Sequence, residues 1–259
     1  MALAKIDDQE LYDLVESNNL KNLENFRVQS VLSKLSKKYN ELKSKDALVA
    51  YTYLGLLEAY KNNYEQAIQL LNNALMISPN EFVVLRNLAK TFERYGQYDK
   101  AVEYYKKAID QASDNVNLYE NIYDISHIYF DLELVDYINK TYTNKLFKKD
   151  ENPSFYHLYH FLESKEFDFE LYKAQLNCVS KAISHYYSLS CADISKFYSG
   201  ESQSLITIFE FKTENTDIIS KINSDYEIEL FKYAQTQHDG GFEFFEKLNQ
   251  SVINFDVAN

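Results

Sequence analysis

Hydrophobic residues recur along most of the chain with the three- and four-residue spacing of an amphipathic helix. Val28, Val31, Leu32 and Leu35 follow this spacing and fall on one helical face. The same spacing recurs in the later part of the chain, at Leu171, Ala174, Cys178, Ala182 and Ile183. Outside the repeats described below, helices are predicted over Asp8–Ser17, Leu20–Lys43, Phe155–Leu162 and Phe169–Leu189.

Beyond residue 200 the pattern changes, and its interpretation stays open. Leu205–Phe211 is rich in β-branched and aromatic residues, and Tyr226–Phe231 alternates polar and apolar positions, so both are strand candidates. A helix remains possible for either segment. A helix around Thr216–Asn223 would join them, and a turn at Asp239–Gly241 would precede a final helix through Phe245 and Leu248.

Turn-forming residues are scarce, because the 259 residues include only 5 glycines and 2 prolines. Average usage predicts roughly 18 and 13. The elements are therefore expected to be long and helical, and sandwiches or barrels are disfavoured. Nucleotide-binding loops need several closely spaced glycines, and the only adjacent pair is Gly240-Gly241.

A shift of 34 residues superimposes two segments of the sequence. It lays Tyr51–Gly55 over residues 85–89 and Tyr64–Ile68 over residues 98–102, and it pairs Ala74 with Ala108. Small residues at Gly55, Ala67 and their equivalents would let neighbouring helices approach closely. Pro79 would end the first unit, because proline blocks further helix.

This pattern resembles the tetratricopeptide repeat, a 34-residue helix-turn-helix unit, in two repeats over residues 48–114. The first repeat departs from the family pattern at Glu58, where an aromatic residue is usual, and the second at Ser113, where a proline is usual. The resemblance implies a mainly α fold, an α-α superhelix that binds a protein or peptide in a concave groove, with no enzymatic activity and no cofactor.

A third unit begins at Asp114, a predicted helix cap, and continues with Tyr119, Ile122 and Phe130 on one face. Its second helix, predicted over Leu134–Phe147, lacks the small residues. The unit is interpreted as a degenerate repeat or a capping element. The expected organisation is a helical domain over residues 1–150, with capping helices over 1–47, followed by an acidic helical or small α+β region over 151–259.

Net charge separates the two regions further. The whole chain has 27 Lys and Arg against 39 Asp and Glu, net −12, and residues 151–259 alone carry net −9. This balance argues against nucleic-acid binding, which relies on Lys and Arg. With no apolar window long enough for a membrane helix and no signal-peptide core, we expect a cytoplasmic protein that binds no membrane.

Candidate catalytic groups are few. His157 and His160 share a helix face and could take a metal, but no HExxH pattern accompanies them, and no metal site is predicted. An enzyme built around these two residues and His185, or around a Cys178 or Cys191 nucleophile, is the least favoured interpretation.

The family resemblance implies that the first helix of each repeat lines the groove. Carried over onto this sequence, the implied groove residues are Val49, Thr52, Leu56 and Tyr60 in the first unit, Val83, Arg86, Asn87, Lys90 and Arg94 in the second, and Asn117, Glu120, Asp124 and His127 in the third.

Arg86, Lys90 and Arg94 are spaced by four and form a cationic stripe on one helix. The stripe could bind acidic groups of an extended peptide while Asn87 bonds its backbone. The alternative is a solvated helix face paired with Glu93 and Asp99. The carboxylate clamp of chaperone co-factors is disfavoured, because Thr52 and Leu56 stand where it needs Lys and Asn.

Two functions follow from these observations. The first is a non-enzymatic adaptor that binds a protein or peptide in the groove. The second is an immunity- or antitoxin-type inhibitor whose acidic C-terminal surface neutralises a basic toxin, since complementary charge speeds association. The partner and the oligomeric state are not predicted.

Overall fold

The structure, a computed structural model, describes residues 26–112, 115–141, 153–186, 192–213, 216–237 and 242–258. The helix predicted over Asp8–Ser17 lies outside these ranges, as does the expected domain boundary near residue 150, which stays a prediction. By packing, the chain divides into two compact units. The first unit holds the helices up to Gln111 together with residues 184–186, and the second holds the remaining elements.

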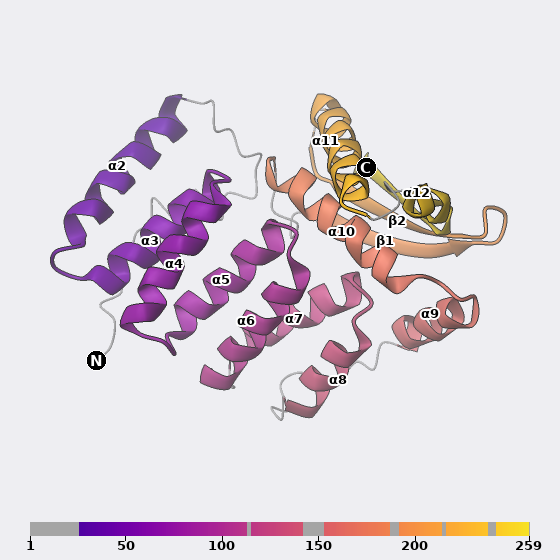
Figure 1. Ribbon diagram of the computed structural model, residues 1–259, viewed down its shortest axis with the longest axis horizontal. Helices are drawn as coiled ribbons and strands as arrows, with labels where there is room; N and C mark the ends of the chain where they lie inside the picture. The colour runs from indigo at the N-terminus through magenta and orange to yellow at the C-terminus, as the bar shows by residue number, and fades with distance from the viewer. Residues whose placement is uncertain are drawn as a thin grey trace. The chain divides into compact units, whose positions relative to one another are not determined.

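The first unit is a row of antiparallel helices, each packed on the next (Figure 1). The helices are α2 (Phe26–Leu42), α3 (Ala47–Tyr60), α4 (Tyr64–Ile77), α5 (Phe82–Arg94) and α6 (Tyr98–Gln111). The most extensive contacts join α3 to α4 and α5 to α6, which are the pairs expected for helix-turn-helix repeats.

Small residues set the distance between paired helices, as the repeat pattern predicts. A Cβ atom placed on Gly55 of α3 would lie 2.7 Å from the Cγ atom of Leu71 in α4, closer than side-chain atoms pack. Ala67, Ala74 and Ala101 are fully buried. Pro79 follows the end of α4 at Ile77, so the predicted stop is confirmed.

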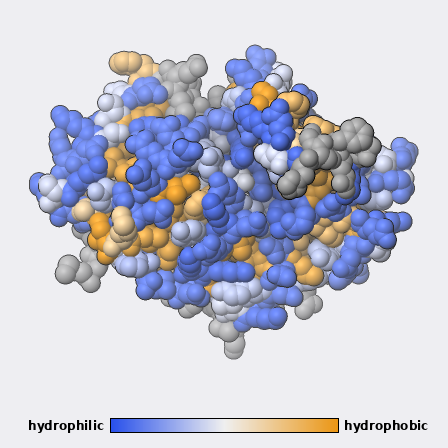
Figure 2. Space-filling model, in the orientation of Figure 1, coloured by the Kyte–Doolittle hydropathy of each residue, from blue (hydrophilic) through white to orange (hydrophobic). Residues whose placement is uncertain are grey.

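A hydrophobic cluster joins α2 to the repeats and confirms the amphipathic pattern of the predicted helix over Leu20–Lys43, within its described part. Tyr39 of α2 stacks on Tyr53 of α3, with ring centroids 4.8 Å apart. Figure 2 shows hydrophobic residues gathered over α3 and α4 on an otherwise mainly hydrophilic face. The buried members of the cluster are Leu32, Leu35, Tyr39, Leu54, Leu57 and Tyr60.

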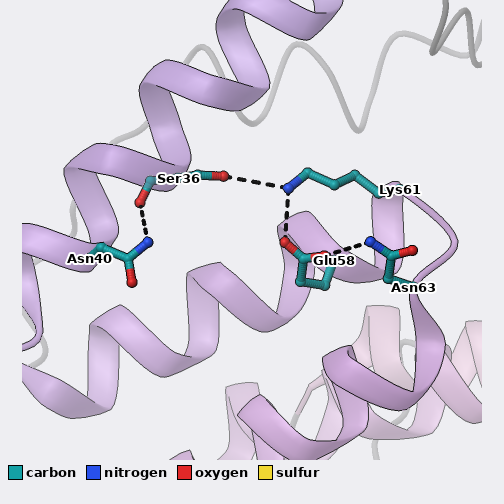
Figure 3. A network of polar contacts seen from close by, with 5 residues as sticks. All are labelled: Ser36, Asn40, Glu58, Lys61 and Asn63. Carbon is teal, nitrogen blue, oxygen red and sulfur yellow. Dashed lines mark hydrogen bonds and ion pairs between the residues drawn. The ribbon is translucent and has the colours of Figure 1, made fainter.

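Glu58, which departs from the family pattern, is buried in the last turn of α3, beside the connection to α4 (Figure 3). Its carboxylate accepts hydrogen bonds from Lys61 Nζ at 2.8 Å and from Asn63 Nδ2 at 2.7 Å. Lys61 Nζ also reaches the Ser36 hydroxyl of α2 at 3.5 Å. A polar network therefore replaces the usual aromatic contact at this position.

Four turns between paired helices share one backbone geometry. In each turn a residue adopts a left-handed conformation: Asn62 (φ 67°), Gly96 (φ 65°), Phe130 (φ 54°) and Glu166 (φ 57°). The amide of the following residue then bonds a carbonyl five residues earlier, as in a Schellman C-cap. The first three turn residues are 34 positions apart, so the repeat period continues beyond residue 114 in the backbone.

The second unit begins with two further helix pairs. Asn115 caps the first helix by accepting a hydrogen bond from the Leu118 amide at 3.0 Å, whereas the predicted cap, Asp114, lies outside the described residues. The predicted second helix of this unit begins at Leu132, two residues early, and its end beyond Thr141 is not described. The helices are α7 (Val116–Ile128), α8 (Leu132–Thr141), α9 (Pro153–Ser164) and α10 (Phe169–Ser184).

A three-stranded sheet completes the second unit. The central strand β2 pairs antiparallel with β1 and parallel with β3. The strand alternative for Leu205–Phe211, for which a helix also stayed possible, is confirmed as β2, whereas no strand is predicted for β1 or β3. The elements are β1 (Ala192–Ser199), β2 (Ser204–Phe211), α11 (Thr216–Gln235), α12 (Phe242–Lys247), the 3-10 helix η2 (Leu248–Gln250) and β3 (Ser251–Val257).

The strand considered for Tyr226–Phe231 is wrong, because these residues lie within the long helix α11. Tyr226, Leu230 and Ala234 are buried at four-residue steps, and Tyr226 packs edge-on against Phe255 of β3. Tertiary packing of this helical stripe outweighs the local alternation of polar and apolar residues.

Helices α10 and α11 cover one face of the sheet (Figure 1). The Tyr172 hydroxyl of α10 lies 2.9 Å from the Thr207 hydroxyl of β2, and Gln175 Nε2 donates to the Ser251 carbonyl of β3 at 3.3 Å. The predicted helix over Phe169–Leu189 is confirmed as far as Ser184.

Lys196 of β1 ties the sheet to the end of α7. Its ammonium donates to the carbonyl oxygens of His127, at 2.9 Å, and Ile128, and it lies 4.2 Å from the Phe130 ring centroid. Burial lowers the pKa of this lysine. A cation at a helix C-terminus satisfies carbonyl groups that have no partner within the helix.

Candidate functional site

A cavity of about 280 Å³ lies between α3 and α5, the first helices of the two repeats. Most of its wall is apolar. The lining residues are Leu48, Val49, Thr52, Tyr53, Leu56, Glu81, Val83, Val84, Arg86 and Asn87. Six of the residues assigned to the groove from the family resemblance are therefore brought together here: Val49, Thr52, Leu56, Val83, Arg86 and Asn87.

Two nitrogen atoms in this wall are buried without a hydrogen-bond partner among the described residues. They are Nδ2 of Asn87, whose residue is only 5% exposed, and Nε of Arg86. An amide nitrogen removed from water without a new partner costs about 1–3 kcal/mol. Two neighbouring donors in this wall therefore lack an acceptor among the described residues.

Thr52, Tyr53 and Glu81 also bring polar groups to the lining of the cavity, and the hydroxyl of Thr52 is occupied. The Thr52 hydroxyl donates to the Leu48 carbonyl at 2.8 Å, one turn earlier in α3. Thr52 therefore presents mainly its methyl group, which extends the apolar wall formed with Tyr53 and Leu56. Tyr60, also assigned to the groove, does not line the cavity, because it is buried in the cluster with α2.

Arg86 lies over the Phe82 ring of its own helix, 5.7 Å from the ring centroid. Burial lowers the pKa of its guanidinium, but an arginine stays charged in proteins. A positive charge is therefore held at the rim of an apolar cavity.

Lys90 and Arg94 continue the stripe along α5, outside the cavity, and both are half-buried. Between them, Glu93 accepts a 2.6 Å hydrogen bond from the Tyr105 hydroxyl. Burial raises the pKa of Glu93, and this outweighs Tyr105, Lys90 and Arg94, which lower it. When ionised, Glu93 offsets part of the positive charge of Lys90 and Arg94. Arg86, in contrast, lines the cavity.

The residues assigned to the third repeat belong to the second unit, on α7. Glu120 and Asp124 are exposed. The His127 ring packs between Tyr123 and Phe155, with centroids at 4.0 and 4.2 Å, and its burial lowers its pKa. His127 therefore acts as a packing residue of α7 and α9, and the side chain of Asn117 is outside the described set.

The described groups considered for catalysis lie at exposed or isolated positions within their own units. His157 and His160 are exposed on α9, and His160 Nδ1 lies 3.1 Å from Glu163. Cys178 is buried, which raises the pKa of its thiol to about 12, and Cys191 lies outside the described residues. Among the described residues, no three His, Cys, Asp or Glu side chains could hold a metal ion.

Four lining residues were not assigned from the sequence: Leu48, Tyr53, Glu81 and Val84. Tyr53 and Val84 lie beside groove positions on the same helices, and a helical-wheel projection would have shown their direction. Glu81 lies just before α5, so the helical periodicity of the repeat does not include it.

None of the described helices is long and apolar enough to span a membrane.

Comparison with protein families supports the repeat. The family model described as tetratricopeptide repeat matches residues 46–114, which contain α3 to α6. A comparison with curated proteins gave no match to the chain. Tetratricopeptide repeats mediate protein–protein interactions, and they are typically interaction modules rather than enzymes. Residues 46–114, with their 34-residue period, small-residue contacts and paired helices, are two repeats of the tetratricopeptide repeat family.

Proposed function

We propose that the cavity between α3 and α5 binds an extended segment of a partner protein, and that the protein is a non-enzymatic adaptor. The observation that carries this proposal is the pair of unpartnered donors, Asn87 Nδ2 and Arg86 Nε, in the wall of an apolar cavity.

The size of the cavity suits a peptide side chain. Its volume of about 280 Å³ lies at the lower end of the range for ligand pockets, about 300 to 1,000 Å³. One or two apolar side chains of an extended segment would fill it. Burial of each would contribute about 1.5–3 kcal/mol.

The donors define the polar part of the segment. The Asn87 amide would donate to a backbone carbonyl, and Arg86 would bind a carboxylate. Because both nitrogens are shielded from solvent, we expect the flexible Arg86 side chain to shift when the segment binds. The preferred partner segment therefore carries an apolar residue followed closely by an acidic residue or a chain terminus.

Selection from a random peptide display library against the full chain tests this function. Selected peptides should share an apolar residue next to an acidic one, and Asn87→Leu should weaken them by about tenfold, the value of one hydrogen bond to a buried site. Glu65→Gln, in an open depression between α4 and α6, should leave the affinity unchanged. Peptides that bind wild type and Asn87→Leu equally would place binding elsewhere.

A further inference from the structure

The sheet of the second unit has one covered and one open face. Successive strand residues point to opposite faces, and α10 and α11 pack against the face of Thr207 and Phe209. On the opposite face the outer-strand residues are exposed and the central-strand residues are half-buried. The residues of this open face are Asp193, Ser195 and Phe197 in β1, Ile206, Ile208 and Glu210 in β2, and Val252, Asn254 and Asp256 in β3.

The strand register arranges the open face in three rows. Phe197, Ile206 and Val252 are cross-strand partners and form an apolar row. Phe197 is 48% exposed and Val252 is 39% exposed, which is high for large apolar residues that are direct neighbours of a third. Contiguous exposed apolar side chains, unlike scattered ones, indicate an interaction surface.

The third row is wholly acidic. Asp193, Glu210 and Asp256 are cross-strand partners, so three carboxylates lie side by side. Asp193 forms an exposed ion pair with Lys212, with 3.5 Å between Nζ and Oδ2. Within the described part of the chain, no lysine or arginine forms an ion pair with Glu210 or Asp256. Like charges directly opposite one another destabilise a sheet, and a cationic partner would relieve this repulsion.

A metal ion is not the partner that this row fits, since no described group of three such side chains could hold one. A second copy of the chain is also disfavoured, because each copy carries net charge −12. Nucleic acid would be repelled by the same carboxylates. Lysine or arginine side chains of another protein remain as the complement.

We propose that the open face of this sheet docks a helix of another protein, one that carries apolar residues on one half of a face and basic residues on the other half of the same face. Apolar residues of that helix cover Phe197, Ile206 and Val252, and its lysines or arginines lie over Asp193, Glu210 and Asp256. This surface is separate from the cavity of the repeats, and it gives the acidic C-terminal region a binding role that does not depend on that cavity.

The spacing of the rows fits a helix. The apolar row and the acidic row are four positions apart along each strand, about 13 Å at 3.3 Å per residue. Residues eight apart on a helix lie on one face and about 12 Å apart. Helices cover both faces of mostly parallel sheets, which shows that a helix fits a sheet face, and here the described helices cover one face.

The test uses a fluorescein-labelled 18-residue peptide with leucines on one half of a helical face and lysines on the other half. Its affinity for the full chain is measured by fluorescence anisotropy. We expect binding that weakens by about tenfold between 0.05 and 0.5 M salt, because exposed charges are screened. A peptide with every lysine replaced by glutamate should bind at least about tenfold more weakly.

Two double variants map the site. Glu210→Lys with Asp256→Lys should weaken the lysine peptide by about tenfold or more, and Phe197→Ser with Val252→Ser should weaken it by a similar factor. Where the charge reversal fails to fold, Glu210→Gln with Asp256→Asn serves in its place. Glu227→Lys, on the exposed face of α11, is the matched control and should change little.

Equal binding by wild type and both double variants would overturn the proposal. So would concentration-dependent self-association that Phe197→Ser abolishes, because a second copy would then be the occupant. Asn87→Leu separates this proposal from the repeat cavity: it should leave binding of the lysine peptide unchanged, and a large loss in that variant would assign the peptide to the cavity.

Discussion

Gly96 and Phe130 lie 34 residues apart at the same place in two interhelical turns, and both have a left-handed backbone, with φ of 65° and 54°. The sequence puts glycine, which adopts this conformation without strain, at only one of the four equivalent turns. Asparagine, as at Asn62, also visits this conformation, whereas Phe130 and Glu166 adopt it at a cost of about 1 kcal/mol or more. Helix pairs whose side chains no longer follow the family pattern therefore share this turn geometry with the two repeats.

Glu166→Gly should stabilise the protein by about 1 kcal/mol, because it removes that backbone strain. The Glu166 side chain is exposed, so little contact is lost. Glu227→Gly, at an exposed position inside α11, should destabilise by about 1 kcal/mol. Urea unfolding measures both values. A loss of stability in Glu166→Gly would contradict the role assigned to this turn.

Glu58→Ala should destabilise the first unit by about 1–3 kcal/mol, because Lys61 and Asn63 lose a charged acceptor in a partly buried turn. Glu103, paired with Lys107 on an exposed surface, is the comparison. Glu103→Ala should cost no more than about 0.5 kcal/mol. Equal costs in thermal or urea unfolding would show that the network of Figure 3 contributes nothing beyond a surface ion pair.

Glu93 makes stability depend on pH. Its pKa is raised in the folded state, chiefly by burial, so the folded protein binds more protons than the unfolded chain. The contribution of Glu93 to stability therefore falls as pH rises from the ordinary glutamate pKa through the raised value.

Glu93→Gln removes that dependence and still accepts from the Tyr105 hydroxyl. The free energy of unfolding of this variant, relative to wild type, should increase as pH rises above about 4.3, as measured by urea unfolding at a series of pH values. Parallel curves for the two proteins would show that the Glu93 pKa is not raised by folding.

Asn87→Leu should raise stability, by about 1 kcal/mol or more, because it removes a buried amide nitrogen that has no partner in the described structure. Thr91→Val is the contrasting change, since its hydroxyl donates to the Asn87 carbonyl at 2.7 Å. It should cost about 1 kcal/mol. A stabilised variant that binds selected peptides poorly would show that the unpartnered donor is kept for binding.

Cys178 should be almost inert to alkylation in the folded protein. Burial excludes reagent and raises the pKa of the thiol to about 12, so the thiolate is scarce at neutral pH. In a Cys191→Ser background, labelling with iodoacetamide should be slow natively and become fast in 6 M urea. Rapid native labelling would mean that α10 opens far more readily than its packing indicates.

The repeat region was predictable because its signal is carried by residue size. Gly55 and the buried alanines stand where helices touch, and the 34-residue spacing survives in those positions. The same 34-residue register correctly assigned six of the residues that line the cavity. Tyr60 was also assigned to the groove but does not line the cavity, because α2 packs on α3 and buries that side of the helix.

The second unit was harder to predict because its elements depend on long-range packing. Tyr226–Phe231 alternates like a strand but is held as a helix by contacts with β3. No strand is predicted for β1, because alternate residues such as Asp193 and Ser195 are polar and leave no continuous apolar segment; in the structure they are exposed on the open face. Two of the three strands are therefore absent from the prediction, whereas the central strand, which is mostly apolar, is one of the two alternatives given for Leu205–Phe211.

The most direct test of the adaptor function is to titrate a display-selected peptide into a variant of the protein in which the cationic stripe of α5 is charge-reversed. Arg86→Glu with Lys90→Glu should weaken the peptide by at least about tenfold and leave the helical circular-dichroism spectrum intact, because complementary charge at the site is lost. Lys100→Glu with Lys107→Glu, an equal charge change on α6, should alter the affinity by less than about twofold. Unchanged affinity in the Arg86→Glu and Lys90→Glu protein, with an intact helical spectrum, would contradict binding in the cavity between α3 and α5.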